Sequence, residues 1–129
     1  MSAAPRHVLI ADDQSDIGAI LAKIMTRRGL IPIVVSNGTD AIAAAQSAAS
    51  DLCIVILDIQ TPGMSGVDAA VVIHQLVPQV PIVLMTGGIA PQTILFATQF
   101  PIAEMLSKPF TIADVDALLI RLGLINPRP

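Results

Sequence analysis

Acidic, hydroxyl and amine side chains stand at or just after the ends of four short apolar runs in this 129-residue chain. Asp12 and Asp13 directly follow one run, and Asp58 closes another. Two carboxylates about 4 Å apart repel each other by roughly 4 kcal/mol at an effective dielectric constant of 20. If the three meet, either one keeps a proton at a raised pKa or a cation lies among them. An all-oxygen group of this kind suits Mg²⁺, which binds through a few carboxylates together with water and phosphate.

A hydroxyl and an amine complete this set of side chains. Thr86 ends a third apolar run, and Lys108 closely follows a weaker one. With a cation present, a carboxylate is able to attack phosphorus while the metal and an ammonium neutralise the transferring phosphoryl group. Asp58 is the best candidate nucleophile because it stands alone at the end of its run. Thr86 would donate a hydrogen bond to a phosphoryl oxygen, and Lys108 would pair with another.

Five apolar runs must position these side chains, and they alternate with segments of helical periodicity. The runs cover residues 8–11, 33–35, 53–57, 82–85 and, more weakly, 105–106. Unbroken apolar character is typical of parallel strands covered by helices on both faces. Right-handed crossovers then favour a doubly wound α/β sandwich. In such a sheet the functional edge lies at the carboxyl ends of the strands, where all the polar residues above would meet.

Helices are predicted between these runs. The first covers about residues 17–25, with Ser15 or Asp16 as the candidate N-cap and Gly29 as the stop. The others are expected over residues 37–49, 69–77 and 115–122, and in the apolar stretch 91–100. Six aspartates are expected to cap helices or to lie in their first turns, namely Asp16, Asp40, Asp51, Asp68, Asp114 and Asp116.

Composition excludes several classes of protein. Apolar residues make up 53% of the chain and charged residues 13%, which is far from the signature of disorder, and the length suits one domain. The net charge of −3 and the lack of a Lys or Arg cluster argue against a nucleic-acid partner. No apolar run is long enough for a membrane span or a signal-peptide core, so we expect a cytoplasmic location and no membrane partner.

The chain resembles the receiver domain of bacterial two-component response regulators over about residues 7–122. The resemblance rests on five separated motifs, in order "IADD", "SNGTDAI", "LDIQTPGMSGVDA", "LMTGG" and "SKPF". It implies a flavodoxin-like sheet of strand order 2-1-3-4-5 and a single receiver domain over residues 1–129. A stand-alone regulator similar to those of chemotaxis is expected, although a piece of a longer regulator or hybrid kinase would show the same motifs.

The resemblance also implies what each site residue does. Asp58 would be the phosphoacceptor, and a histidine kinase or a histidine-phosphotransfer protein would supply the phosphoryl group. Asp13 and Asp58 would coordinate Mg²⁺ together with the main-chain carbonyl of Gln60, and Asp12 would act largely through bound water. Such a protein signals by contact with other proteins and is not an enzyme with an external substrate.

Three further positions carry expectations from the family. Thr86 would be the switch hydroxyl that moves toward the new phosphate, and Lys108 would bridge to it. The Lys108–Pro109 bond resembles the family's cis peptide. Met105 departs from the family, which commonly has an aromatic residue at this position to couple with the switch hydroxyl.

Two other functions stay open at this point. Met105 leaves room for an adaptor with a receiver fold that binds its partner without phosphate. A small phosphohydrolase with an aspartate nucleophile would share the acidic strand end, but such enzymes usually carry a second acid two residues beyond it, where this chain has Gln14 or Ser15. Residues 91–100 and the last helix are candidates for contact with a downstream protein or a second copy of the chain.

Overall fold

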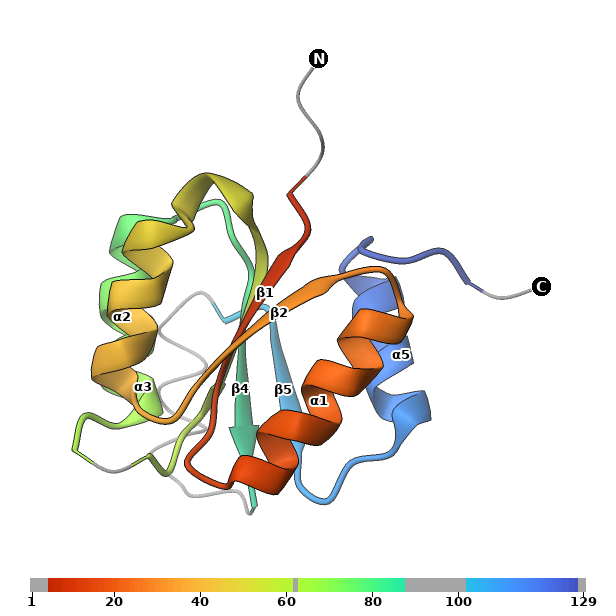
Figure 1. Ribbon diagram of the computed structural model, residues 1–129, viewed down its shortest axis with the longest axis horizontal. Helices are drawn as coiled ribbons and strands as arrows, with labels where there is room; N and C mark the ends of the chain where they lie inside the picture. Colours follow the sequence, from red (N-terminus) through yellow and green to blue (C-terminus); the bar gives the residue numbers. More distant parts are fainter. Residues whose placement is uncertain (1–4, 62, 88–101, 128–129) are drawn as a thin grey trace.

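The computed structural model describes residues 5–61, 63–87 and 102–127 and shows a parallel sheet between two helical layers (Figure 1). The strand order is β2-β1-β3-β4-β5, which confirms the predicted topology. The strands are β1 (His7–Ala11), β2 (Ile31–Val35), β3 (Leu52–Asp58), β4 (Ile82–Thr86) and β5 (Glu104–Ser107). The described helices are α1 (Ser15–Arg27), α2 (Gly38–Ser47), α3 (Gly66–Leu76) and α5 (Ile112–Arg121), with a 3-10 turn, η1 (Ala49–Asp51). The helix expected around residues 91–100 lies outside the described residues.

The register of the strands brings their carboxyl ends together. Ala11, the last residue of β1, pairs with both Val35 of β2 and Leu57 of β3. Asp58 in turn pairs with Met85 of β4. Because all neighbouring strands run parallel, the residues that follow these positions collect at one edge of the sheet.

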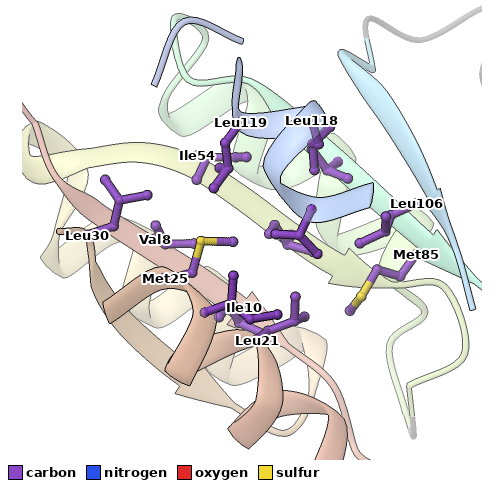
Figure 2. Packing of buried hydrophobic residues seen from close by; sticks show 14 of the residues in the cluster. Val8, Ile10, Leu21, Met25, Leu30, Ile54, Met85, Leu106, Leu118 and Leu119 are labelled. Atoms are coloured by element: carbon purple, nitrogen blue, oxygen red, sulfur yellow. The ribbon is translucent and has the colours of Figure 1, made fainter. Parts of the chain in front are cut away.

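The two helical layers bury separate apolar clusters on the two faces of the sheet. Figure 2 shows one of them, in which Leu21 and Met25 of α1 and Leu118 and Leu119 of α5 pack over the sheet. The second cluster lies under α2 and α3 and contains many alanines. Every residue of the central strand β3 is buried, so this strand is fixed from both sides.

The edge strands β2 and β5 are the exceptions to the prediction of strands buried on both faces, since β2 has no buried residue and β5 has only Leu106. Ile31 and Val34 are 49% and 46% exposed, because β2 has a neighbouring strand on one side only. Cys53 is buried and carries a free thiol, in agreement with its expected place in the core.

Side-chain caps start three of the described helices. Asn37, Ser65 and Thr111 each accept a hydrogen bond from the amide three residues on, as the first turns of α2, α3 and α5 require. For α1 the prediction of Ser15 or Asp16 as N-cap was wrong. The N-cap is Gln14, which makes no side-chain capping bond, and Ser15 is already inside the helix.

The ends of α1 also show one prediction confirmed and one wrong. Gly29 has a φ of 80°, a left-handed conformation that glycine adopts without strain, and it ends the helix as expected. Asp116 is neither a cap nor a first-turn acid, since it lies in the middle of α5 and binds Arg28 at the end of α1.

Within residues 5–61, 63–87 and 102–127, no helix combines the length and the apolar character needed to cross a bilayer.

Candidate functional site

The three aspartates predicted to meet do lie together at the carboxyl edge of the sheet. Asp12 and Asp13 follow β1, and Asp58 is the last residue of the neighbouring strand β3. One carboxylate oxygen from each lies within 4.8 Å of those of the other two. Asp12 and Asp58 are only 2% and 4% exposed, whereas Asp13 is exposed to solvent. The cluster therefore has two buried members and one that faces outward.

Backbone amides fix one oxygen of each buried carboxylate. Asp12 Oδ1 accepts a hydrogen bond of 2.9 Å from the amide of Gln14, and Asp58 Oδ1 accepts one of 2.9 Å from the amide of Gln60. Both are local turns of the kind that aspartate forms with the backbone two residues on. The second oxygen, Oδ2, of each carboxylate is left to face the shared site.

Lys108 lies between the two buried carboxylates. Its Nζ is 2.7 Å from Asp58 Oδ2 and 2.8 Å from Asp12 Oδ2. Both contacts are ion pairs, and the one with Asp58 is also a hydrogen bond. Burial lowers the pKa of Lys108, but the contacts and charges of Asp12 and Asp58 outweigh it, so the pKa is raised. The side chain therefore stays an ammonium at neutral pH.

The backbone around Lys108 places its side chain at the site. The Lys108–Pro109 peptide is cis, as the resemblance implied. The amide of Lys108 donates a 2.7 Å hydrogen bond to the carbonyl of Thr86, the last residue of β4. The predicted hydroxyl residue therefore lies at the same edge as Lys108 and the aspartates, and it is 7% exposed.

Gly66 lies against the main chain of Asp58. A Cβ atom at Gly66 would be 2.1 Å from the carbonyl oxygen of Asp58, far closer than any real contact. The amide of Gly66 also donates to the carbonyl of Ile59 at 3.1 Å. The motif that follows Asp58 therefore needs glycine here so that α3 can begin directly beside the aspartate.

The donor set fits a metal ion. Three carboxylates face a single ammonium, which leaves an excess of negative charge, and the oxygen atoms are close enough to share one cation. The ligand role expected for the Gln60 carbonyl stays a prediction, although the Gln60 amide does bind Asp58. Met105 lies half-buried on β5, and Gly88, which belongs to the "LMTGG" motif, lies outside the described residues.

One partner at this site was missed from the sequence. Gln14 Oε1 accepts a hydrogen bond of 2.9 Å from Lys108 Nζ. The two residues are 94 positions apart, so no local pattern joins them. The available signal was indirect: glutamine is not a preferred N-cap, yet it stands where α1 begins.

Comparison with protein families gives a match over most of the chain. The model of the response regulator receiver domain covers residues 8–120. Transcription factor SKN7 of Saccharomyces cerevisiae is 32% identical over 115 residues, which is 89% of this chain. The chain spans only 18% of the length of that relative. What the rest of the yeast protein does is therefore a separate matter.

Solved structures show the same fold. A CheY-like receiver domain protein from Methanospirillum hungatei superposes with a TM-score of 0.85 at 19% identity, covering 93% of this chain and 95% of that one. The CheX–CheY–BeF₃–Mg²⁺ complex from Borrelia burgdorferi gives a TM-score of 0.84 at 22% identity, covering 93% and 90%. At these identities the likeness concerns the fold.

Proposed function

The chain belongs to the response regulator receiver domain family, and from this membership and the site geometry we propose that Asp58 is its phosphoacceptor. Receiver domains are phosphoacceptor signalling domains and are generally not enzymes. The single observation that carries the proposal is the Lys108 ammonium, held 2.7 Å from Asp58 Oδ2 and 2.8 Å from Asp12 Oδ2. It places a fixed positive charge beside the one carboxylate that ends a fully buried strand.

The chemistry is a displacement at phosphorus. A carboxylate oxygen of Asp58 forms a bond to the phosphorus of the donor, and the bond from phosphorus to the donor's leaving atom breaks with its electron pair. Lys108 neutralises a phosphoryl oxygen, and the Thr86 hydroxyl donates a hydrogen bond to another. No proton has to leave Asp58 because it reacts as a carboxylate. Hydrolysis of the acyl phosphate later returns Asp58 and inorganic phosphate.

We assign the cation of this site as Mg²⁺. Asp12, Asp13, Asp58 and the main-chain carbonyl of Gln60 would hold it, with Asp12 acting largely through water. When bound, Mg²⁺ supplies positive charge that offsets the carboxylates and the phosphoryl oxygens. The charge balance supports this assignment, because three carboxylates, two of them buried, share the site with the Lys108 ammonium.

The partners follow from the same chemistry. A histidine kinase or a histidine-phosphotransfer protein is the phosphoryl donor, and a protein that recognises the phosphorylated state receives the signal. We propose that one receiver domain over residues 1–129, in a cytoplasmic protein, both accepts the phosphoryl group and contacts the protein that receives the signal. Residues 91–100, proposed as a partner or dimer surface together with the last helix, lie outside the described residues.

The test is the intact mass of the protein after incubation with Mg²⁺ and acetyl phosphate. We expect one added phosphoryl group, lost in the Asp58→Asn variant and lost with a chelator. If the mass does not change and no inorganic phosphate is released, Asp58 is not an acceptor and the adaptor function is favoured. Sustained turnover of phosphate esters would instead favour a phosphohydrolase.

A further inference from the structure

Among the residues that the structure describes, Lys108 has one neutral partner in addition to its two carboxylates. An ammonium carries three hydrogens, and three oxygen atoms surround this one: Asp58 Oδ2 at 2.7 Å, Asp12 Oδ2 at 2.8 Å and Gln14 Oε1 at 2.9 Å. Two of these contacts are hydrogen bonds and the one with Asp12 is an ion pair. Gln14 is therefore the only partner in this set that orients the ammonium without adding negative charge.

The backbone of Gln14 is held from both sides. Its amide donates to Asp12 Oδ1 at 2.9 Å, and its carbonyl accepts from Ile17 and Gly18 at 3.1 and 3.2 Å in the first turn of α1. The first turn of α1 therefore fixes where the Gln14 side chain begins. The hydrogen bond from the Gln14 amide to Asp12 links this turn to the acidic cluster. The backbone of Gln14 is therefore already ordered, and only its exposed side chain has to give up rotamer freedom to bind Lys108.

Helix capping does not explain why this residue is glutamine. Serine, threonine, aspartate and asparagine are the preferred N-caps, and the other described α-helices begin with Asn37, Ser65 and Thr111. Gln14 makes no side-chain capping bond. Its longer side chain instead reaches Lys108, which comes from the far end of the chain.

From these contacts we propose that Gln14 is a positioning residue that holds the Lys108 ammonium over Asp58 during phosphoryl transfer. When the phosphoryl group arrives, the hydrogen bond that Lys108 donates to Asp58 Oδ2 must be replaced by one to a phosphoryl oxygen. The contact with Gln14 need not break, so it keeps the ammonium in place during that exchange. A carboxylate in its position would add a fourth negative charge to the cluster, which would repel an anionic donor.

This inference rests on the proposed function for its kinetic consequence but not for its structural one. The structural consequence is tested in the unphosphorylated protein by ¹⁵N relaxation of the Lys108 ammonium. Gln14→Met keeps the backbone contacts and the length of the side chain but removes the acceptor, so we expect a more mobile ammonium. Gln14→Glu retains an oxygen acceptor and should keep Lys108 ordered. An equally ordered ammonium in Gln14→Met would overturn the proposal.

The kinetic consequence is tested with acetyl phosphate, whose phosphorus bonds to Asp58 as acetate leaves. We expect Gln14→Met to lower the rate of phosphoryl uptake at saturating Mg²⁺ and acetyl phosphate by about fivefold, the effect of losing one ordinary, solvent-exposed hydrogen bond. The Mg²⁺ affinity, measured by amide shifts in NMR spectra, should stay within about twofold because no metal ligand changes.

The matched control is Gln75→Met, the same substitution on the exposed surface of α3, which should leave both readouts unchanged. Wild-type uptake with equal uptake by Gln14→Met would refute the positioning role. No uptake by the wild type, with a mobile Lys108 in Gln14→Met, would refute the proposed phosphoacceptor and leave the positioning contact standing. Thermal unfolding of each variant shows that it is folded before its rate is compared.

Discussion

The two helical layers cover opposite faces of one sheet (Figure 1). They are built from different side chains. The layer of α1 and α5 fills its space with large residues, among them Leu21, Met25 and Leu118 (Figure 2). The layer of α2 and α3 has Ala41, Ala45, Ala69 and Ala70 at its centre. The first layer is therefore held by the size of its side chains, and the second by how closely its helices approach.

The close approach can be seen at the start of α2. A Cβ atom added to Gly38 would lie 3.2 Å from the Cβ of Ala69 on α3 and 3.0 Å from the carbonyl oxygen of Met64. The other layer has a polar tie instead, since Arg28 at the end of α1 binds both oxygens of Asp116 on α5, at 2.6 and 2.8 Å. This difference indicates that the two layers should be destabilised by opposite changes. The layer of α1 and α5 should be sensitive to the removal of atoms, and the layer of α2 and α3 to their addition.

The largest effect is expected where the α3 layer meets the site. Gly66→Ala should lower the free energy of unfolding by about 4 kcal/mol, because its Cβ would collide with the main chain of Asp58. Urea unfolding followed by circular dichroism measures this, and phosphoryl uptake should fall with it. Gly87→Ala is the control, since a Cβ there meets nothing within 4 Å. Equal stability of the two variants would contradict the close approach of α3.

Removing atoms from the α1 and α5 layer should have the next largest effect. Leu118→Ala truncates a side chain that is 1% exposed in a cluster of large residues. We expect a loss of about 3 kcal/mol in the free energy of unfolding, since the surroundings only partly collapse onto the cavity. Leu76→Ala, at a position 39% exposed on α3, should cost much less. Equal losses would show that Leu118 is not part of a tightly filled core.

Adding atoms to the other layer, the opposite change, should also destabilise the protein, but by less. Ala69→Leu places three more carbons where α3 faces Gly38 of α2, and we expect a loss of about 2 kcal/mol from overpacking. Ala43→Leu on the exposed side of α2 is the matched control and should be nearly neutral. Urea unfolding of both variants decides the point. A neutral Ala69→Leu would mean that size does not limit this layer.

The smallest effect is expected from the tie between α1 and α5. The hydrogen bond from Arg28 to Asp116 raises the pKa of the guanidinium, but both side chains are partly exposed and solvent weakens their attraction. In a double-mutant cycle of Arg28→Met and Asp116→Asn, we expect a stabilising coupling smaller than either core effect. The coupling should shrink in concentrated salt. A coupling that salt leaves unchanged would show that the contact is not mainly electrostatic.

The resemblance to receiver domains implied the order of the strands, and the apolar runs predicted the meeting of the three aspartates with Thr86 and Lys108. Each of these side chains stands at or just beyond the end of an apolar run, and parallel strands bring their ends to one edge. The partners of Gln14 and Asp116 could not be predicted. Their contacts join positions 94 and 88 residues apart, and no periodicity or capping rule connects such positions.

The sequence by itself determined the strands, the approximate positions of the described α-helices and the residue types of the site, because hydrophobic periodicity and chain punctuation act over short distances. Three of these helices begin two or three residues before the predicted start. Only the tertiary structure decided that Gln14 precedes α1 as an N-cap without a side-chain capping bond, that Gly66 must lie against Asp58, and that Arg28 reaches Asp116. These features depend on how separate elements pack against one another. The physical reason is that a side chain's final partner is set by the distance between elements, which no local stretch of sequence encodes.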